Sequence, residues 1–394
     1  MKLLHLADLH IGKRVYEYSM LEEQKAALLQ AFQMAKEHQV DAVLIAGDVY
    51  DKTIPTVEGV KLFDTFLTAL KTKKIPAFII SGNHDSAERL SFGRHLFENA
   101  EIYMSGTYEE EILKKTLVDE FGEVDIYLLP FLKPQQIEVA EGEEKPKDYT
   151  EAIRLVLNRL NINKNNRNVL IAHQFVGGSS VEPERADSET QSVGGVDMVD
   201  YRVFEAFDYV ALGHLHGAQH VGRETVRYAG SPVKYSFSEA RQVKTATLIT
   251  IGRKSMGPME NNEVMASAEI MIEKLPFTPI HDMREVRGTL AQLTSPEVLE
   301  EADPQDYMHI TLTDEEDIYD VFGKLRAVYP NLMALDFDNS RTRAEGAATM
   351  IGTAMKEKTT MELFREFFEK QAGAGLTPMQ EQIMTDIIEK NGDE

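Results

Sequence analysis

The stretch Ala77–Asp85, AFIISGNHD, decides the fold. Its apolar first half predicts a short buried strand. Gly82 allows the backbone to turn sharply after that strand, so that Asn83, His84 and Asp85 reach one loop tip. Polar residues at strand ends are common, and this tetrapeptide alone is a modest signal. It gains weight because four other segments of the same kind accompany it.

Those four segments also follow apolar runs and end in histidine or aspartate: Asp8-x-His10, Asp48-x-x-Asp51, His173 and His214-x-His216. Side chains at positions i and i+2 of a strand end point the same way, because side-chain direction repeats every two residues. Helical patterns over 21–38 and 56–73 separate the first three apolar runs. The order strand–helix–strand–helix–strand predicts an α/β layered core, with the polar side chains gathered at the strand ends.

These residue types indicate a metal centre. The sequence contains no cysteine, so any metal must be held by histidine, aspartate, glutamate or asparagine. Two divalent cations about 3.5–4 Å apart need several such donors and a bridging carboxylate. Taken singly, each candidate is better explained as a polar residue that caps a loop, but together and in this order they favour metal binding. The candidate ligands are Asp8, His10, Asp48, Asn83, His173, His214 and His216.

We also expect these seven ligands to divide between two cations. Asp8, His10 and His216 are expected at one cation, and Asn83, His173 and His214 at the other. Asp48 is the expected bridge between the two. Nitrogen and oxygen donors suit manganese, iron, zinc and other divalent ions, so the donors alone leave the metal open.

The five segments match the pattern DxH, GDxxD, GNH(D/E), H and GHxH, in this order. On these motifs the chain resembles the calcineurin-like metallophosphoesterases over roughly residues 1–250. Within them it resembles the break-repair nucleases, on the segments ADLHIG (7–12), IAHQF (171–175) and YAGSPVKYS (228–236). The resemblance implies a manganese-dependent nuclease subunit. It would act as a 3′→5′ exonuclease on double strands and as an endonuclease on single strands and hairpins, in DNA repair, recombination and replication.

The resemblance also implies roles for two further residues. His84 is expected at the leaving oxygen, as a general acid or charge stabiliser. Asp51 is the carboxylate expected to orient His84, although related nucleases carry a histidine at that place. For Asp85, a role in supporting the site and a role as a turn residue both stay open. Basic residues near the motifs are candidates for contacts to DNA phosphates, with ordinary solvated charge an equal alternative: Lys13, Arg14, Arg89, Arg94 and Lys234.

Changes of composition divide the 394 residues into parts. A polar stretch at 255–262 separates an expected phosphoesterase domain at 1–254 from a small α+β capping domain at 263–338. We expect strands near 267–273, 307–313 and 332–337 in the capping domain. The composition of residues 339–357 predicts a linker. Two amphipathic helices within 358–392 are interpreted as a hairpin that docks an ATPase partner, with packing into a core as the alternative.

The net charge of −23 argues against a broad basic surface for nucleic acid. No apolar run is long enough for a membrane span, and the first residues lack a signal-peptide pattern, so a cytoplasmic location is expected. The resemblance implies a homodimer formed through the N-terminal domain. Two other functions stay open: a phosphatase or cyclic-nucleotide phosphodiesterase acting on small phosphoesters, and a non-catalytic scaffold that binds DNA ends.

Overall fold

The computed structural model describes residues 1–139, 144–178, 183–189, 197–260, 263–300, 303–316, 318–340 and 342, and the positions 364, 365, 368, 376, 377, 379–381 and 384. Side chains of 256–260 and 263–267 are outside the description. The linker predicted over 339–357 and the hairpin predicted within 358–392 therefore lie almost entirely outside the described residues.

The first sheet carries three of the motifs at its strand ends. β1 (Lys2–Leu6), β4 (Ala42–Ala46), β5 (Ala77–Ile80) and β6 (Ile102–Ser105) pair in parallel. The long strands β15 (Thr245–Glu260) and β16 (Glu263–Pro276) extend the sheet with antiparallel pairing, which gives the order β16-β15-β1-β4-β5-β6. Parallel neighbours end at the same edge, so the motifs after β1, β4 and β5 meet there.

The second sheet carries the remaining motifs. Its order is β13-β14-β12-β9-β8-β7. The strands are β7 (Leu113–Asp119), β8 (Gly122–Leu129), β9 (Arg167–His173), β12 (Tyr209–Gly213), β13 (His220–Val221) and β14 (Arg223–Tyr228). Strands β8, β9, β12 and β14 run in parallel, so His173 and the segment after β12 lie at one edge of this sheet.

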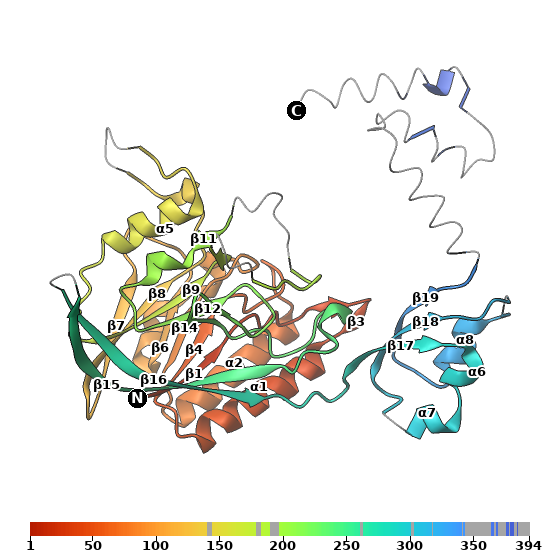
Figure 1. Cartoon of the computed structure of the whole chain (residues 1–394), viewed down its shortest axis with the longest axis horizontal. Helices are drawn as coiled ribbons and strands as arrows, with labels where there is room; N and C mark the ends of the chain where they lie inside the picture. Colours follow the sequence, from red (N-terminus) through yellow and green to blue (C-terminus); the bar gives the residue numbers. More distant parts are fainter. Residues whose placement is uncertain are drawn as a thin grey trace.

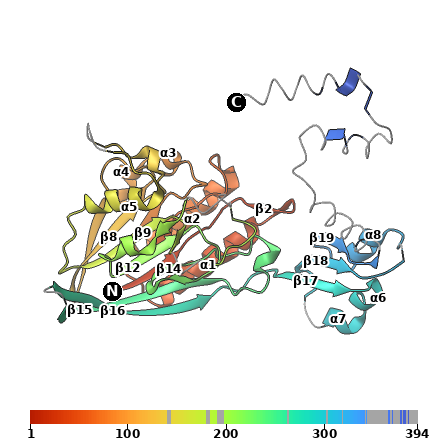
Figure 2. The ribbon, with the colours of Figure 1, turned by 45° about the horizontal axis from the view of Figure 1, so that its top comes forward.

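The two sheets face each other through a fully apolar layer. Leu44 and Phe78 of the first sheet pack there with Ile171 and Ala211 of the second. Helices α1 (Leu21–Glu37) and α2 (Val57–Thr72) cover the outer face of the first sheet, and α5 (Tyr149–Asn158) covers that of the second. The result is a layered α/β core, seen from two directions in Figures 1 and 2.

A smaller α+β unit follows the long hairpin, in cyan and blue in Figure 1. Strands β17 (Met283–Gly288), β18 (Tyr307–Leu312) and β19 (Leu332–Phe337) form a parallel sheet. Helices α6 (Leu290–Leu293), α7 (Pro296–Glu300) and α8 (Val321–Arg326) accompany it, and the unit has its own apolar core. It touches the layered core directly, since the Tyr18 hydroxyl donates to the Leu332 carbonyl at 3.1 Å.

The remaining described elements are short. They are β2 (Arg14–Val15), β3 (Tyr18–Ser19), β10 (Val176–Gly177), β11 (Val199–Asp200), the helices α3 (Ala87–Leu90) and α4 (Arg94–Phe97), and 3-10 turns at 98–100, 134–136, 201–204 and 237–239. Residues 87–98 do not form one continuous helix. Gly93 adopts a left-handed conformation with φ of 76° and separates α3 from α4.

One boundary also differs from the sequence prediction. The strand expected over 267–273 in the capping domain is instead part of β16, which completes the first sheet. Within the polar stretch, residues 255–260 belong to β15, and Met259 pairs there with Val264 of β16. None of the described helices has both the length and the apolar character that crossing a lipid bilayer requires.

Candidate metal centre

All seven candidate ligands lie directly at strand ends of the two facing sheets. Five of them are buried, and Asn83 and His214 are partly exposed. Strands β1, β4 and β5 of the first sheet precede Asp8, His10, Asp48 and Asn83, whereas β9 and β12 of the second precede or include His173, His214 and His216. The sheet packing therefore brings together residues from both halves of the phosphoesterase core.

Several of these residues sit on a strained backbone. Positive φ angles occur at Asp8 (53°), His10 (43°), Asp48 (49°) and His214 (108°). A left-handed conformation costs a non-glycine residue on the order of 1–3 kcal/mol and persists only where the surrounding structure enforces it. Such strain clusters at functional sites, because it points side chains in directions that a relaxed backbone does not allow.

Two glycines permit the close approach of the loops. A Cβ atom at Gly82 would lie 2.1 Å from Oδ1 of Asp48. A Cβ atom at Gly213 would lie 1.9 Å from the Ala46 carbonyl and 2.8 Å from Nδ1 of His173. Both distances are shorter than a van der Waals contact, so only glycine fits at these positions.

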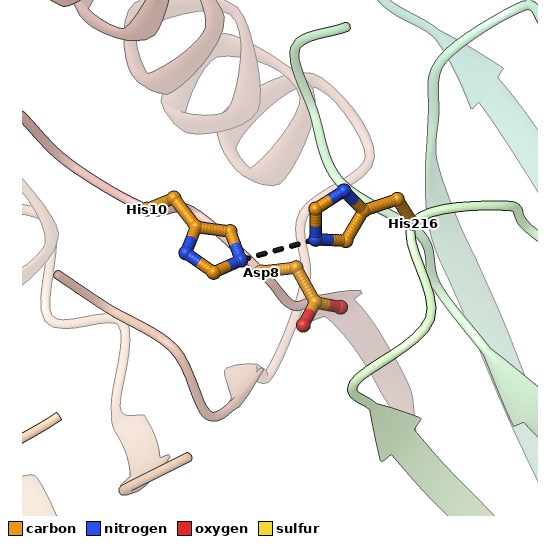
Figure 3. A group of neighbouring side chains, drawn as sticks. All are labelled: Asp8, His10 and His216. Carbon is orange, nitrogen blue, oxygen red and sulfur yellow. Dashed lines mark hydrogen bonds between the residues drawn. The ribbon is translucent and has the colours of Figure 1, made fainter. Parts of the chain in front are cut away.

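The first group of donors consists of Asp8, His10 and His216. The Nε2 atoms of the two histidines lie 3.1 Å apart, and Figure 3 shows the rings facing each other with the Asp8 carboxylate beside them. Oδ1 of Asp8 accepts the His214 amide at 2.9 Å, whereas Oδ2 is buried and has no hydrogen-bond partner within the described part of the chain. Buried polar atoms are rarely left unpaired, so this oxygen and the two nitrogens suit a shared cation.

The second group is centred on Asp48, which also reaches the first. Its Oδ2 lies 3.4 Å from Nε2 of His173 and 3.6 Å from Nε2 of His10. Oδ1 of Asn83 lies 3.1 Å from the same nitrogen of His173 and 2.9 Å from Nδ1 of His214. Asp48 thus lies between the two groups, in the position that a bridging carboxylate requires.

The charges of the site are strongly perturbed. Burial alone would lower the pKa of His173, but the Asp48 carboxylate raises it to about 9. Burial lowers the pKa of His214 to about 3 and raises the pKa of Asp8 well above its usual range. Oxygen and nitrogen donors packed together away from water are stabilised by divalent cations, which bind deprotonated ligands and release the protons.

Hydrogen bonds fix the orientation of two of the histidines. Nδ1 of His173 donates to the Ala46 carbonyl at 2.8 Å, which directs Nε2 toward Asp48 as the atom that would bind a cation after losing its proton. Nδ1 of His216 contacts the Ser188 hydroxyl at 2.8 Å, and this hydroxyl donates to Oε1 of Glu239 at 2.6 Å. Partners of this kind hold ligating histidines in the correct tautomer.

Glu239 is a supporting residue that the sequence analysis missed. It is fully buried, and Oε1 lies 3.5 Å from Nδ1 of His216. Burial would raise its pKa, but His216 and the buried Lys244 ammonium lower it to about 2. Glu239 lies in a short 3-10 turn and not at the end of an apolar run, so no motif in the sequence marks it.

Asp85 supports the site by joining two of its loops. Its carboxylate accepts the amides of Gly82 at 2.9 Å, Val49 at 3.1 Å and Tyr50 at 2.9 Å. Burial, with a contribution from Asp48, raises its pKa to about 6. The carboxylate therefore ties the loop after β5 to the loop after β4, which goes beyond the local role of a turn residue.

His84 lies beside the first group, but its predicted partner differs. Its ring is 4.8 Å from that of His10, and its amide donates to Oδ1 of Asp48 at 2.9 Å. Nδ1 of His84 contacts the main-chain carbonyl of Asp51 at 3.1 Å, whereas the Asp51 carboxylate accepts Lys13 at 2.9 Å. The prediction that the Asp51 side chain orients His84 is wrong, because the backbone of the same residue does so.

The five predicted DNA-contacting residues occupy different environments. The side chain of Lys234 is 12% exposed, and its ammonium contacts Asp282 at 2.7 Å, so a DNA contact by Lys234 stays a prediction. Arg94 pairs with Glu109 at 2.9 Å. Arg14 and Arg89 lie on the surface, and Lys13 lies closest to the metal ligands, since the Asp51 carboxylate that it contacts is 3.9 Å from Nδ1 of His10.

The chain is similar to several known proteins. The chain is 29% identical over 406 aligned residues to the SbcD subunit of nuclease SbcCD from Staphylococcus epidermidis, with both chains covered completely. Two solved structures are also similar. TT1561 of Thermus thermophilus has 14% identity, a TM-score of 0.37 and coverage of 62% of this chain and 92% of that one. A dimetal phosphatase from Danio rerio has 12% identity, a TM-score of 0.37 and coverage of 71% and 99%.

Two family models match separate parts of the chain. The model described as Type 5 capsule protein repressor C-terminal domain matches residues 279–372. The model described as Calcineurin-like phosphoesterase matches residues 1–218, which is more than half of the chain and includes every candidate metal ligand. The chain therefore belongs to the calcineurin-like phosphoesterase family.

Proposed function

We propose that this phosphoesterase is the nuclease subunit of an SbcC–SbcD-type complex, and that it hydrolyses phosphodiester bonds of DNA with two Mn²⁺ ions. The observation that carries the metal-dependent chemistry is the position of Asp48 between His10 and His173. The DNA substrate is supported by full-length similarity to a protein named as a nuclease subunit. The proposed activities are a 3′→5′ exonuclease on double strands and an endonuclease on single strands and hairpins, in DNA repair and recombination.

We assign the ions to the two donor groups described above. Asp8, His10 and His216 would hold one ion, Asn83, His173 and His214 would hold the other, and the Asp48 carboxylate would contribute to both. Bound in this way, the ions would supply a nucleophile from water and stabilise the charge that develops on the phosphate oxygens. They would also make the site locally positive, which attracts a phosphodiester to a chain whose net charge is −23.

His84 is the proposed proton donor to the leaving oxygen. Nδ1 of His84 contacts the Asp51 carbonyl, so Nε2 is the ring nitrogen that remains to contact the substrate. The amide of His84 is held by Asp48, so the ring is positioned from the same residue that is proposed to bridge the ions. Asp85 keeps the loops of Asp48 and His84 together, which holds the donor at a constant place relative to the ligands.

We also propose how the chain is divided and what it binds. The phosphoesterase domain, predicted over 1–254, extends to Pro276 with the β15–β16 hairpin, and the capping domain follows up to residue 338. A linker at 339–357 leads to a docking segment at 358–392 for an SbcC-type ATPase. The name of the full-length relative, a subunit of a complex, supports a partner. With DNA as its substrate, the protein would work in the cytoplasm.

A homodimer is the last part of the proposal. The surface beside α2 exposes large apolar side chains: Phe92 is 84% exposed, Leu96 77% and Val60 44%. These residues line a groove of about 400 Å³ together with Leu67. Exposed apolar side chains of this kind favour an interaction surface, and a second copy of the chain is the partner that we propose for it.

The proposed function is tested by assaying the metal-loaded protein on three substrates. These are linear double-stranded DNA, a DNA hairpin and p-nitrophenyl phosphate, each with and without Mn²⁺. We expect Mn²⁺-dependent cleavage of both DNAs, stimulated by the ATPase partner with ATP. Turnover of the small phosphoester with intact DNA would instead favour a phosphatase, and DNA binding without any turnover would favour a scaffold.

A further inference from the structure

A second pocket of about 260 Å³ adjoins the metal centre and has no role in the scheme above. We propose that this pocket binds the nucleobase of the nucleotide whose phosphate lies at the metal ions. The inference rests on the proposed function and deepens it, because it specifies which part of the substrate the protein recognises. It assigns a stacking and hydrogen-bonding subsite to residues other than the candidate metal ligands.

The position of the pocket sets which nucleotide enters it. Asn83 and His214 line the pocket and also belong to the second donor group, so a phosphate at that group lies at the pocket entrance. His84, the proposed donor to the leaving oxygen, does not line it. When the bond to the leaving oxygen breaks, that oxygen takes a proton and the phosphate gains the oxygen of water. The nucleotide in the pocket is therefore the one that keeps the phosphate.

Aromatic side chains form the walls. Phe131 and Tyr149 are partly exposed, and Phe175 is buried with the guanidinium of Arg185 lying 3.7 Å from its ring centre. The ring of Phe131 is 6.2 Å from that of His173, so this wall is fixed relative to the metal centre. Aromatic rings of this kind stack on nucleobases with little sequence preference, because every base has a π face.

One polar atom in the pocket has an unused hydrogen-bonding capacity. Oδ1 of Asp197 is buried and has no hydrogen-bond partner among the residues that the structure describes. A buried acceptor without a partner is costly, and a ligand that donates to it relieves the cost. An ionised carboxylate only accepts hydrogen bonds, so it matches the exocyclic amino groups of cytosine, adenine and guanine, whereas thymine offers only the N–H of its ring.

The charge around the pocket fits a nucleotide. Lys133 is exposed at the rim, and the Arg185 guanidinium lies over Phe175, whose ring is 6.3 Å from that of His214. The positive charges of Lys133 and Arg185 offset the negative charge of Asp197 and attract the phosphate group of the ligand. A purely apolar ligand would leave Asp197 unpaired, and inorganic phosphate alone would leave the aromatic walls unused.

The test is calorimetric binding to the full-length, Mn²⁺-loaded protein. The probes are dCMP, dTMP, 2-deoxyribose 5-phosphate and inorganic phosphate. We expect dCMP to bind about tenfold more tightly than 2-deoxyribose 5-phosphate, within the range that stacking provides. Phe131→Ala should remove this advantage and leave the affinity for 2-deoxyribose 5-phosphate unchanged. Phe121→Ala, which removes a ring that is 42% exposed in the β7–β8 turn, is the matched control.

The second variant tests the polar contact. Asp197→Asn should bring the affinities for dCMP and dTMP closer together, since an amide can also donate to a thymine carbonyl. Equal binding of dCMP and 2-deoxyribose 5-phosphate by the unmodified protein would overturn the subsite, even if DNA is cleaved. Release of inorganic phosphate from dCMP, with DNA left intact, would instead overturn the proposed function.

Discussion

The Nε2 atoms of His10 and His216 lie 3.1 Å apart, although 206 positions separate the two residues in the chain. His10 follows β1 of the first sheet and His216 follows β12 of the second. Their contact therefore depends on the apolar layer that holds the two sheets face to face. The metal centre is a product of that packing.

Asp48→Asn should remove the proposed bridge between the two ions. The affinity for Mn²⁺ is expected to fall by more than the ~10–100-fold that changes in supporting residues cause. Metal content after dialysis, measured by elemental analysis, checks this. Asp64→Asn on the exposed side of α2 is the control and should bind metal like the unmodified protein. Two ions retained by Asp48→Asn would contradict the assignment.

Glu239→Gln should weaken one of the two metal sites by about 10–100-fold, because the carboxylate holds His216 through Ser188. Ser188→Ala removes only the linking hydroxyl and should cause a smaller loss in the same direction. Calorimetric titration with Mn²⁺ measures both, and thermal unfolding establishes that the variants are folded. Glu205→Gln, at an exposed position, is the control. An unchanged affinity in Glu239→Gln would show that His216 needs no such support.

His84→Ala and Asp51→Asn should differ in their effect on DNA cleavage. Loss of the proposed donor is expected to slow cleavage by about 10²–10⁴-fold while metal binding persists. Asp51→Asn keeps the main-chain carbonyl that contacts His84, and should cost less than about tenfold. Single-turnover rates on a DNA hairpin compare the two. Wild-type cleavage by His84→Ala would refute the donor role.

Asp119 should make the free energy of unfolding depend on pH in the acidic range. Its hydrogen bonds from the Arg167 guanidinium, which is 1% exposed, hold the pKa of Asp119 well below its usual range. The stabilisation is complete above the unfolded pKa of about 3.9 and is lost as the pH falls towards the lower folded pKa.

Asp119→Asn should therefore lower the free energy of unfolding by about 3 kcal/mol at neutral pH, since it leaves a buried guanidinium without its carboxylate. The difference from the unmodified protein should shrink as the pH falls below about 4. Urea unfolding at a series of pH values measures this, with the exposed Glu120→Gln as control. A difference that does not change with pH would rule out the ion pair as its cause.

Leu96→Asp should weaken the proposed homodimer, because it places a charge in the apolar surface next to α2. Sedimentation velocity over a range of concentrations should show a shift from dimer to monomer. Leu29→Asp is the control, since Leu29 is also apolar and exposed (57%) but lies on α1. Equal dimerisation of both variants would place the interface elsewhere.

Strong local patterns account for what was predictable from sequence. The helices expected over 21–38 and 56–73 are α1 (Leu21–Glu37) and α2 (Val57–Thr72), because each has a regular apolar stripe. The hydroxyl of Thr56 accepts the Gly59 amide and defines where α2 begins. The proximity of the candidate ligands followed from their order at strand ends, since parallel strands end together.

The features that the sequence analysis did not predict depend on interactions that have no sequence signature. The bond from His84 to the Asp51 carbonyl uses the backbone, which every residue offers, so the sequence suggested the side chain instead. Glu239 acts through a hydroxyl on a distant loop, and distance along the chain hides that contact. The strand β16 was assigned to the wrong unit because a polar, glycine- and proline-containing stretch resembles a linker, whereas antiparallel pairing continues through it.

The β15–β16 hairpin decides where the chain can be divided in practice. A fragment that stopped at residue 254 would keep only part of β15 and would lose β16, its hydrogen-bonded neighbour along most of its length. The bare backbone amides and carbonyls would then be free to recruit strands from other molecules, and we expect such a fragment to aggregate. A fragment that ends after Pro276 keeps this border of the sheet paired, and is the smaller piece from which a folded phosphoesterase can be expected.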